Sequence, residues 1–452
     1  MPLPRTPAQR LSRPFVRFTE VEASSGLVLV ACTALALWLA NSDWLAFYHR
    51  VLELEIGVSI GGLHPALTLH ELVNDGLMTI FFFVVGLEIK REFVSGELHE
   101  PRKAALPIAA ALGGMLAPAG IYLAFQFGEP GHNGWGIPMA TDIAFVVGVM
   151  ALLGSRMPHG LKVMLLALAI VDDIGAVVVI AVGYSAGLSA PGLAASAVGF
   201  GLVALLNRIG VRAIGVYAVL GVGIWLTFMQ SGVHSTVAGV LLGLMTPAAP
   251  WVPHEGFFEH CRQVSSRLLG GPRNGEQYAV LLRLARASRE TVPPLERLER
   301  ALHPWVAFGI MPLFALANAG VRIQPGDLGS PVEMAVMLGL LLGKPIGIVS
   351  FSWVFVRMGF AALPDRVDWP AMVGAGFLGG IGFTMALFIA SLALGGELLE
   401  SAKVGILSGS LLSAVVGSIV LLVVLRRKGE SVPSERAVGA AAPASGGAEG
   451  GS

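Results

Sequence analysis

Apolar blocks recur along almost the whole chain, most of them close to the ~20 residues that a membrane-spanning helix needs. The blocks are continuous rather than alternating, so they predict helices and not half-buried strands. We therefore predict an all-α polytopic membrane protein with twelve transmembrane helices. The blocks cover residues 24–40, 72–94, 104–127, 134–153, 161–184, 190–206, 212–230, 233–247, 303–321, 332–356, 369–394 and 402–425.

The polar segments between these blocks predict the remaining organisation. Residues 52–70 alternate in hydrophobicity around Gly61-Gly62, which is typical of a small β-hairpin outside the membrane. Residues 248–302 are Arg-rich and partly heptad-like, which favours an amphipathic helix running into the ninth span. The predicted division is a cytoplasmic N-terminal segment 1–23, spans one to eight 24–247, a cytoplasmic Arg-rich loop 248–302, spans nine to twelve 303–425 and a disordered cytoplasmic tail 426–452.

The distribution of basic residues predicts the orientation in the membrane. With the N-terminus in the cytoplasm, 26 of the 30 Lys and Arg residues fall in cytoplasmic segments. Only Arg50, Arg322 and Lys403 fall on the opposite side, and Lys344 lies inside the tenth span. Since loops rich in Lys and Arg stay in the cytoplasm, both termini are predicted to be cytoplasmic and the number of spans to be even.

Composition agrees with a membrane protein and excludes several other classes. Hydrophobic residues make up 54% of the chain and charged residues 13%, with a mean hydropathy of +0.73, whereas a soluble domain carries about twice that charged fraction. The net charge is zero, so no overall field favours nucleic acid. Cys32 lies in an apolar span and Cys261 in a polar loop, which argues against a disulfide or a cysteine metal cluster. We expect no cofactor and no cleavable signal peptide.

The fifth span contains the most unusual feature of the sequence, the adjacent pair Asp172 and Asp173. A carboxylate near mid-membrane costs roughly 2.5–3.5 kcal/mol on insertion scales. A structural ion pair with Lys344 would satisfy one of the two aspartates and leave the other without a cation. Neighbouring helix positions point about 100° apart, so one carboxylate can face a water cavity while the other faces a partner helix. We therefore predict that the pair is a functional site.

Other ionisable residues in the spans have alternative interpretations. Asp142 lies deep in span four, and His234 begins span eight. Asp75, near the outer end of span two, fits either a pathway residue or a residue at the mouth or an interface. Glu88 lies in the segment LEIKRE at the end of the same span, where a solvated face is the simpler interpretation.

Two spans carry signs of an interrupted helix. Pro138 precedes Thr141-Asp142 in span four, and a mid-span proline frees a backbone carbonyl that must be buried or face water. The glycines Gly380 and Gly382 lie at the middle of span eleven and fit either an unwound helix or tight helix packing. Spans three to five and ten to twelve place the interrupted span second in groups that begin on opposite sides of the membrane. This layout is expected of inverted repeats whose broken helices meet at a midplane ion site. Asp142 and Lys344 would then balance the partial charges of the half-helix ends.

The assembled motifs resemble those of the NhaA-type bacterial sodium/proton antiporters, a family known for this architecture. The resemblance covers about residues 20–425 and follows one order along the chain. Its signatures are VNDGLMTIFFFVVGLEIKRE, ATDIAFVVGVMALLGSR, LALAIVDDIGAVVVIA, SGVHSTVAGV, LHPWVAFGIMPLFALANAGV, GKPIGI and GGIGFTMALFIASLA.

The resemblance implies a role for each matching residue. Asp172 and Asp173 match the ion-binding aspartates, where Na⁺ would bind, with Thr141 and Asp142 at the crossing of spans four and eleven. Lys344 matches the lysine that pairs with the first aspartate, and Asp75 matches a pathway carboxylate. Positions tied to the pH response are Glu88, Arg91, Glu92, His234 and Glu299. The Arg-rich loop and the low-complexity tail have no counterpart in the family pattern.

The resemblance also implies a transporter rather than an enzyme. It implies twelve helices, a homodimer whose contacts include the hairpin, and a place in the bacterial inner membrane. The expected activity is electrogenic, pH-activated exchange of cytoplasmic Na⁺ or Li⁺ for external H⁺. Because burial disfavours a charged carboxylate, the same oxygens can hold either a proton or a hard cation, so the two compete. The expected partners are therefore Na⁺, Li⁺, H⁺ and membrane lipid.

Other functions remain as alternatives at this point. A cation channel or a symporter would use the same acidic site. An intramembrane aspartyl protease needs catalytic aspartates on different helices, and the Gly-x-Gly-Asp motif is absent. A prenyl transferase needs spaced aspartates that hold Mg²⁺ and diphosphate, whereas Asp172 and Asp173 are adjacent.

Overall fold

The structure of the chain is a computed structural model that describes residues 22–57, 66–154, 157–185, 187–211, 213–250, 287–322 and 329–430, with 261–262, 282 and 284–285. Nearly all of the predicted N-terminal segment, most of the Arg-rich loop and nearly all of the tail lie outside the described residues.

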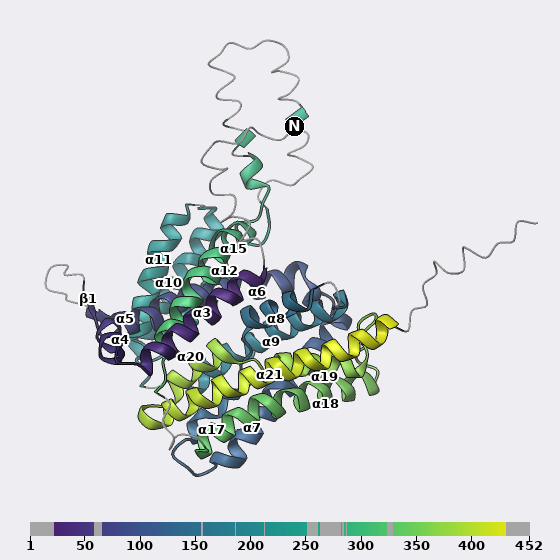
Figure 1. Cartoon of the computed structure of the whole chain (residues 1–452). Helices are drawn as coiled ribbons and strands as arrows, with labels where there is room; N and C mark the ends of the chain where they lie inside the picture. Colours follow the sequence, from purple (N-terminus) through teal and green to yellow (C-terminus); the bar gives the residue numbers. More distant parts are fainter. Residues whose placement is uncertain are drawn as a thin grey trace, which may run out of the picture.

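The described chain is almost entirely helical, as the apolar pattern predicts (Figure 1). The α-helices are α3 (Glu22–Ala40), α4 (Leu45–Leu52), α5 (Leu69–Glu71), α6 (Met78–Ser95), α7 (Pro101–Gln126), α8 (Ile143–Leu153), α9 (His159–Gly183), α10 (Ala190–Ile209), α11 (Ile214–Met229), α12 (Ser235–Met245), α15 (Pro294–Trp305), α16 (Met311–Asn318), α17 (Pro331–Leu338), α18 (Lys344–Arg357), α19 (Trp369–Gly379), α20 (Phe383–Ala393) and α21 (Gly396–Glu430). Shorter turns are the π-helical η1 (Leu72–Leu77), η5 (Val306–Ile310) and η6 (Gly339–Gly343), and the 3₁₀ turns η2 (Glu97–His99) and η3 (His132–Met139).

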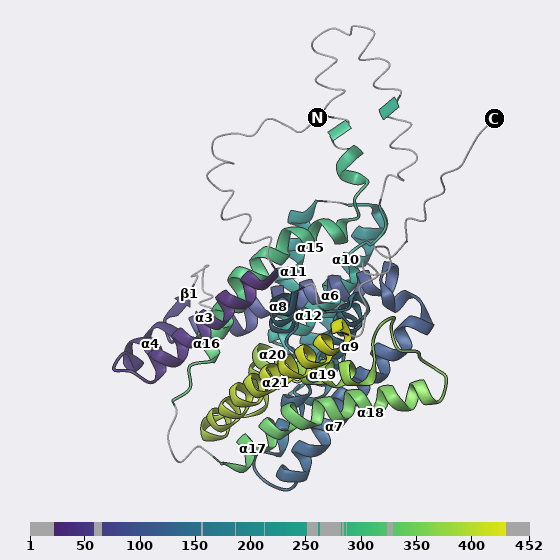
Figure 2. The ribbon, with the colours of Figure 1, turned by 45° about the vertical axis from the view of Figure 1, so that its right-hand side comes forward.

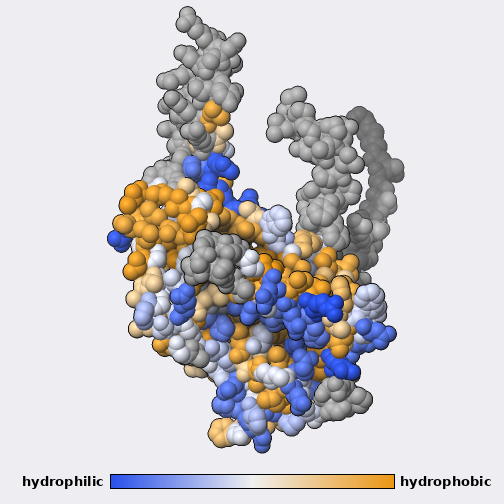
Figure 3. Space-filling model, turned by 90° about the vertical axis from the view of Figure 1, so that its left-hand side faces the viewer, coloured by the Kyte–Doolittle hydropathy of each residue, from blue (hydrophilic) through white to orange (hydrophobic). Residues whose placement is uncertain are grey.

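Among the described residues, eight helical segments are long and apolar enough to cross a membrane, or up to ten if each of two bent helix pairs is one span. The predicted spans seven and eight coincide with α11 and α12, which are apolar but shorter. A polytopic helical membrane protein is therefore confirmed, while the count of twelve spans stays a prediction. Figure 3 shows a broad hydrophobic area on one face, beside a region with many hydrophilic residues.

Two short strands occupy the region predicted as a hairpin. The strands β1 (Glu55–Gly57) and β2 (Ala66–Thr68) pair antiparallel, with Ile56 opposite Leu67. Residues 58–65 between them lie outside the described part of the chain. Thr68 then caps α5, because its hydroxyl accepts from Glu71 N while the Glu71 carboxylate accepts from Thr68 N.

The helices pack closely where glycines face each other. α7 lies along α18, and a side chain at Gly113 or Gly347 would collide with the backbone carbonyl of the other glycine. α6 packs in the same way along α12. Such small residues let helix backbones approach in lipid, where there is no hydrophobic force between helices.

The long helix α21 lies against α17 and α19 and also touches α20, as Figures 1 and 2 show. α19 and α20 form a bent pair with an angle of 46° between them. Span four is interrupted as well: η3 ends at Met139, Ala140 is extended, and α8 begins at Ile143. These two interruptions meet inside the helical bundle, since Asp142 N donates to Ile381 O at 2.7 Å.

Candidate functional site

The tandem aspartates lie in the interior of the bundle. α9 carries both, and the exposed fractions of Asp172 and Asp173 are 2% and 3%. Because they occupy successive helix positions, they face different directions from one backbone. Burial at these fractions means that each carboxylate depends on protein groups, on a proton or on a bound cation.

Lys344 provides a cation for Asp172. Its side chain is fully buried at the first position of α18, where its ammonium forms an ion pair with Asp172 Oδ2 and donates to Thr141 Oγ1 at 2.9 Å. The Thr141 hydroxyl lies within reach of Asp172 Oδ2 and of Gly379 O, the latter at 2.9 Å. A hydroxyl has one hydrogen, so it donates to one of these acceptors at a time. Gly379 ends α19, so Thr141 connects a half-helix C-terminus to the ion pair.

Asp142 lies at the N-termini of two half-helices. It is 1% exposed and caps α8, with Oδ1 accepting from Phe145 N at 3.0 Å. Its Oδ2 accepts from Thr384 N at 3.0 Å and from the Thr384 hydroxyl, at the start of α20. A carboxylate is favourable at a helix N-terminus, and here one carboxylate serves two.

One side of the aspartate pair is left with free acceptor capacity. Asp172 Oδ1 is buried and has no hydrogen-bond partner within the described structure. Asp173 lies in the field of the Asp172, Asp142 and Glu88 carboxylates and of the Lys344 ammonium. Among the residues placed in the structure, no group of three or more His, Cys, Asp or Glu could hold a metal ion. Carboxylate and hydroxyl oxygens are the ligand type that hard cations prefer, and the aspartate pair and Thr141 present such oxygens.

The residues expected to act in the pH response divide between two places. Arg91 forms ion pairs with Glu299 and, at 3.4 Å, with Glu92, so these three lie together at one end of α6. Glu88 joins them through His303, whose Nδ1 lies 3.8 Å from Glu88 Oε1. This cluster connects α6 to α15.

His234 lies elsewhere. It precedes α12, whose first residue Ser235 interacts with the Asp75 carboxylate in η1. Asp75 and Arg91 are sixteen positions apart, or about 24 Å along a helix at 1.5 Å per residue. His234 therefore belongs with Asp75 at the other end of α6.

Three contributing residues were missed from the sequence. Thr384 follows the glycine cluster and Ser410 lies in the last apolar span, and neither is ionisable, so no charge marked them. His303 comes four positions after Glu299, the spacing that places two residues on one helix face, and this spacing is the signal that could have identified it.

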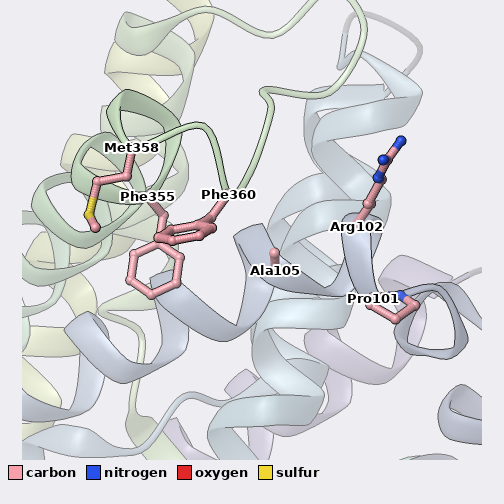
Figure 4. Close-up of a pocket in the computed structure, with 6 residues that line it drawn as sticks. All are labelled: Pro101, Arg102, Ala105, Phe355, Met358 and Phe360. Atoms are coloured by element: carbon pink, nitrogen blue, oxygen red, sulfur yellow. The ribbon is translucent and has the colours of Figure 1, made fainter.

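A separate cavity of about 530 Å³ lies away from these groups, between the start of α7 and the end of α18 (Figure 4). Its lining residues are Pro101, Arg102, Ala105, Phe355, Met358 and Phe360. The lining contains no carboxylate, so this cavity is not the ion site.

Comparison with known proteins decides the family. The family described as Na+/H+ antiporter 1 matches residues 16–421, nearly the whole chain. The chain belongs to this family. It is 51% identical over 428 residues to the "Na(+)/H(+) antiporter NhaA" of Rhodopirellula baltica, covering 93% of this chain and 96% of that one. It is 50% identical over 429 residues to "Na(+)/H(+) antiporter NhaA 2" of Acidiphilium cryptum, covering 94% and 96%, and 49% identical over 421 residues to "Na(+)/H(+) antiporter NhaA" of Rhizobium meliloti, covering 93% and 96%.

Membership in the Na+/H+ antiporter 1 family confirms the resemblance noted from the sequence and supports Na⁺ and H⁺ as the transported ions. The roles of individual residues are a separate question.

Proposed function

We propose that this antiporter exchanges cytoplasmic Na⁺ or Li⁺ for external H⁺ at the tandem aspartates. Asp173 and the unpartnered Oδ1 of Asp172 supply acceptor oxygens, and Thr141 and Asp142 complete the surroundings. The observation that carries the proposal is a buried acidic pair with spare acceptor capacity, placed where two interrupted spans touch.

Exchange follows from competition for these oxygens. A protonated carboxylate has lost its charge and one of its acceptor positions, so it binds Na⁺ poorly. A carboxylate that holds Na⁺ has little affinity for a proton. If the site is open to only one side of the membrane at a time, and changes sides only with an ion bound, then Na⁺ and protons are carried across in turn. Low pH then stops transport because protons occupy the site, and this gives activation as pH rises.

Lys344 serves as the second charged group of the cycle. When Na⁺ binds near Asp172, it offsets the carboxylate charge that stabilises the Lys344 ammonium. The ammonium can then release a proton. More than one proton then moves per Na⁺, which makes the exchange electrogenic. While it is charged, Lys344 also compensates the negative end of α19 through Thr141.

Residues away from the pair would carry ions and respond to pH. Asp75 is proposed as a pathway carboxylate on the outer side, where it interacts with Ser235, the residue after His234. The cluster of Glu88, Arg91, Glu92 and Glu299 would sense cytoplasmic pH at the other end of α6.

The wider organisation completes the proposal. The protein would lie in the bacterial inner membrane with both termini in the cytoplasm and twelve spans in inverted repeats. The two interrupted spans would cross each other, and the strand pair β1–β2 would contribute to a homodimer contact outside the membrane. The Arg-rich loop and the tail would be cytoplasmic.

The test is exchange in everted membrane vesicles with a preset acid interior, followed by a fluorescent ΔpH probe. Adding external Na⁺ or Li⁺ should release the ΔpH in the wild type, increasingly as pH rises, and Asp173→Asn should abolish the signal. Asp43→Asn is the matched control, because Asp43 is exposed in the turn between α3 and α4.

Two results would contradict this function. Acidification of the vesicle interior on adding Na⁺ would indicate a symporter. Undiminished exchange in Asp173→Asn would place the ion site elsewhere.

A further inference from the structure

The inference concerns how the ion site is held in place, and it rests on the proposed function. Lys344 lies where a π-helical turn changes to the α-helix α18. The segment Gly339–Gly343 is π-helical, and Lys344 N donates to Gly339 O, five residues back. In that register the next donor would belong to residue 345 and would reach Leu340 O. Residue 345 is proline, which has no N–H. The Leu340 carbonyl therefore lacks the donor that the π register assigns to it.

The donor that approaches this carbonyl comes from α21. The Ser413 hydroxyl donates to Leu340 O at 3.4 Å, and Ser413 is fully buried. A serine inside a helix commonly bonds a carbonyl of its own preceding turn, as Ser408 does with Val404 O at 2.8 Å. Ser413 reaches across to another helix instead. At 3.4 Å the contact is longer than an ordinary hydroxyl hydrogen bond.

A second serine on the same face of α21 supports the other interrupted span. Ser410 precedes Ser413 by three positions and is 5% exposed. Its hydroxyl oxygen accepts from Phe383 N at 3.1 Å. Thr384 N, the next donor along, goes to Asp142. The first two donors of α20 are thus shared between Ser410 and Asp142, so the seating of α20 on Asp142 depends on both.

Close packing places the two serines where they can act. Gly409 lies against Met337 and Leu340, and Gly417 lies against Leu378, so α21 approaches both α17 and α19. A side chain at Gly380 would collide with Leu340 O and approach Ser413 Oγ. The carbonyl of Leu340, the break after α19 and the Ser413 hydroxyl therefore share one small space.

We propose that Ser413 and Ser410 of α21 are positioning residues for the ion site: Ser413 holds the π turn that directs Lys344 to Asp172, and Ser410 holds α20 against Asp142. α21 itself carries no group that touches the aspartate pair among its described contacts. It contacts both the π turn before Lys344 and the start of α20 at Asp142, so this one helix positions both parts of the site.

The experiment measures the Na⁺ concentration for half-maximal exchange separately from the maximal rate, in vesicles that contain equal amounts of folded protein. Losing one neutral hydrogen bond corresponds to a change of about two- to tenfold, so Ser413→Ala and Ser410→Ala should each raise the half-saturating Na⁺ concentration by that factor. Ser408→Ala is the matched control on the same helix, since its hydroxyl bonds only its own turn in the described structure, and it should leave this concentration unchanged.

A second background makes the test specific to the Leu340 carbonyl. Pro345→Ala restores an N–H at the position that the π register assigns to Leu340 O. Ser413→Ala should then have less than a twofold effect when combined with Pro345→Ala, and Ser410→Ala should keep its full effect there. If Ser413→Ala does not fold, Ser413→Cys, which keeps the shape and only a weak donor, takes its place with the same expectation.

The inference is overturned if folded Ser413 and Ser410 variants match the wild type in half-saturating Na⁺, or if the Ser413 effect is the same in both backgrounds. Either outcome leaves the proposed function intact as long as the wild type exchanges Na⁺ and Asp173→Asn does not. Absence of Na⁺-dependent exchange in the wild type would instead refute the proposed function.

Discussion

Removing the ammonium of Lys344 should destabilise the protein strongly, and neutralising Asp172 as well should restore much of that loss. Lys344 and Asp172 form an ion pair with exposed fractions of 0% and 1% for the two side chains. Deleting one partner of a buried pair costs about 3–5 kcal/mol, because the other charge remains in the interior. Replacing both by neutral groups of similar shape is often close to neutral.

The contacts of Asp172 also predict how the loss of stability depends on pH. In Lys344→Met, Asp172 keeps only the Thr141 hydroxyl, since its Oδ1 has no partner within the described structure. The carboxylate then escapes the cost of its charge by binding a proton. A folded state that holds a proton which the unfolded chain releases loses stability as pH rises. The loss in Lys344→Met should therefore be large at alkaline pH and small at acidic pH.

The assay is thermal unfolding of purified protein in detergent, followed by intrinsic fluorescence at one acidic and one alkaline pH. The four proteins are the wild type, Lys344→Met, Asp172→Asn and the double variant. We expect the unfolding temperature of Lys344→Met to lie several degrees below that of the wild type at alkaline pH. The double variant should recover at least half of this difference. A double variant that loses the sum of the two single losses would refute the reasoning, because contacting groups must couple.

Two further predictions follow from the packing and hydrogen bonds. Thr384→Val keeps the side-chain shape but removes the hydroxyl that donates to Asp142, so the Na⁺ concentration for half-maximal exchange should rise by about two- to tenfold, measured by ΔpH release against added Na⁺. An unchanged value would mean that Asp142 needs only the backbone donors. Gly347→Val should reduce the yield of folded protein on size-exclusion chromatography, since a side chain there meets the Gly113 carbonyl, whereas Gly201→Val faces open space and should behave as the wild type. Equal yields would show that α7 and α18 can separate without cost.

The apolar pattern predicted the positions of the helices because lipid requires long apolar runs. Pro138 predicted an interruption of span four, whereas the glycines around Gly380 fitted either an interruption of span eleven or tight packing; the chain leaves regular α-helix at both places. The contact between the two interruptions could only be supposed from the repeat layout. The hydrogen bond from Asp142 N to Ile381 O depends on a separation of 239 positions, which no local pattern encodes.

Charge made some site residues visible in the sequence and left others hidden. A buried acid in an apolar run is costly, so Asp172, Asp173 and Asp142 were evident from hydropathy alone. Thr384 and Ser410 cost little in a membrane helix, and their importance comes from the groups they face. The π turn before Lys344 was also hidden, although Pro345, which has no N–H to continue the turn, follows Lys344 directly.

Glu333 shows the reverse case. It is a buried acid, 5% exposed, at the beginning of span ten, and sequence reasoning gave it no role. Its carboxylate accepts from Gly329 N at 2.6 Å, and Ser330 caps the same helix end through Glu333 N. These local donors satisfy it at a helix N-terminus, where a carboxylate is favourable. A buried charge therefore indicates an ion site only when its nearest donors leave acceptor capacity unused.

The central claim is that a proton and Na⁺ exclude each other from the same carboxylates. The most direct measurement is calorimetric titration of the purified antiporter with Na⁺ over a series of pH values, in buffers of different ionisation enthalpy that report the protons released. We predict that Na⁺ binding releases protons and that Asp173→Asn binds no Na⁺. If one proton competes, the apparent Kd for Na⁺ should rise about tenfold for each unit by which the pH is lowered in the acidic range. A Kd that does not change with pH, or Na⁺ binding without proton release, would contradict the account.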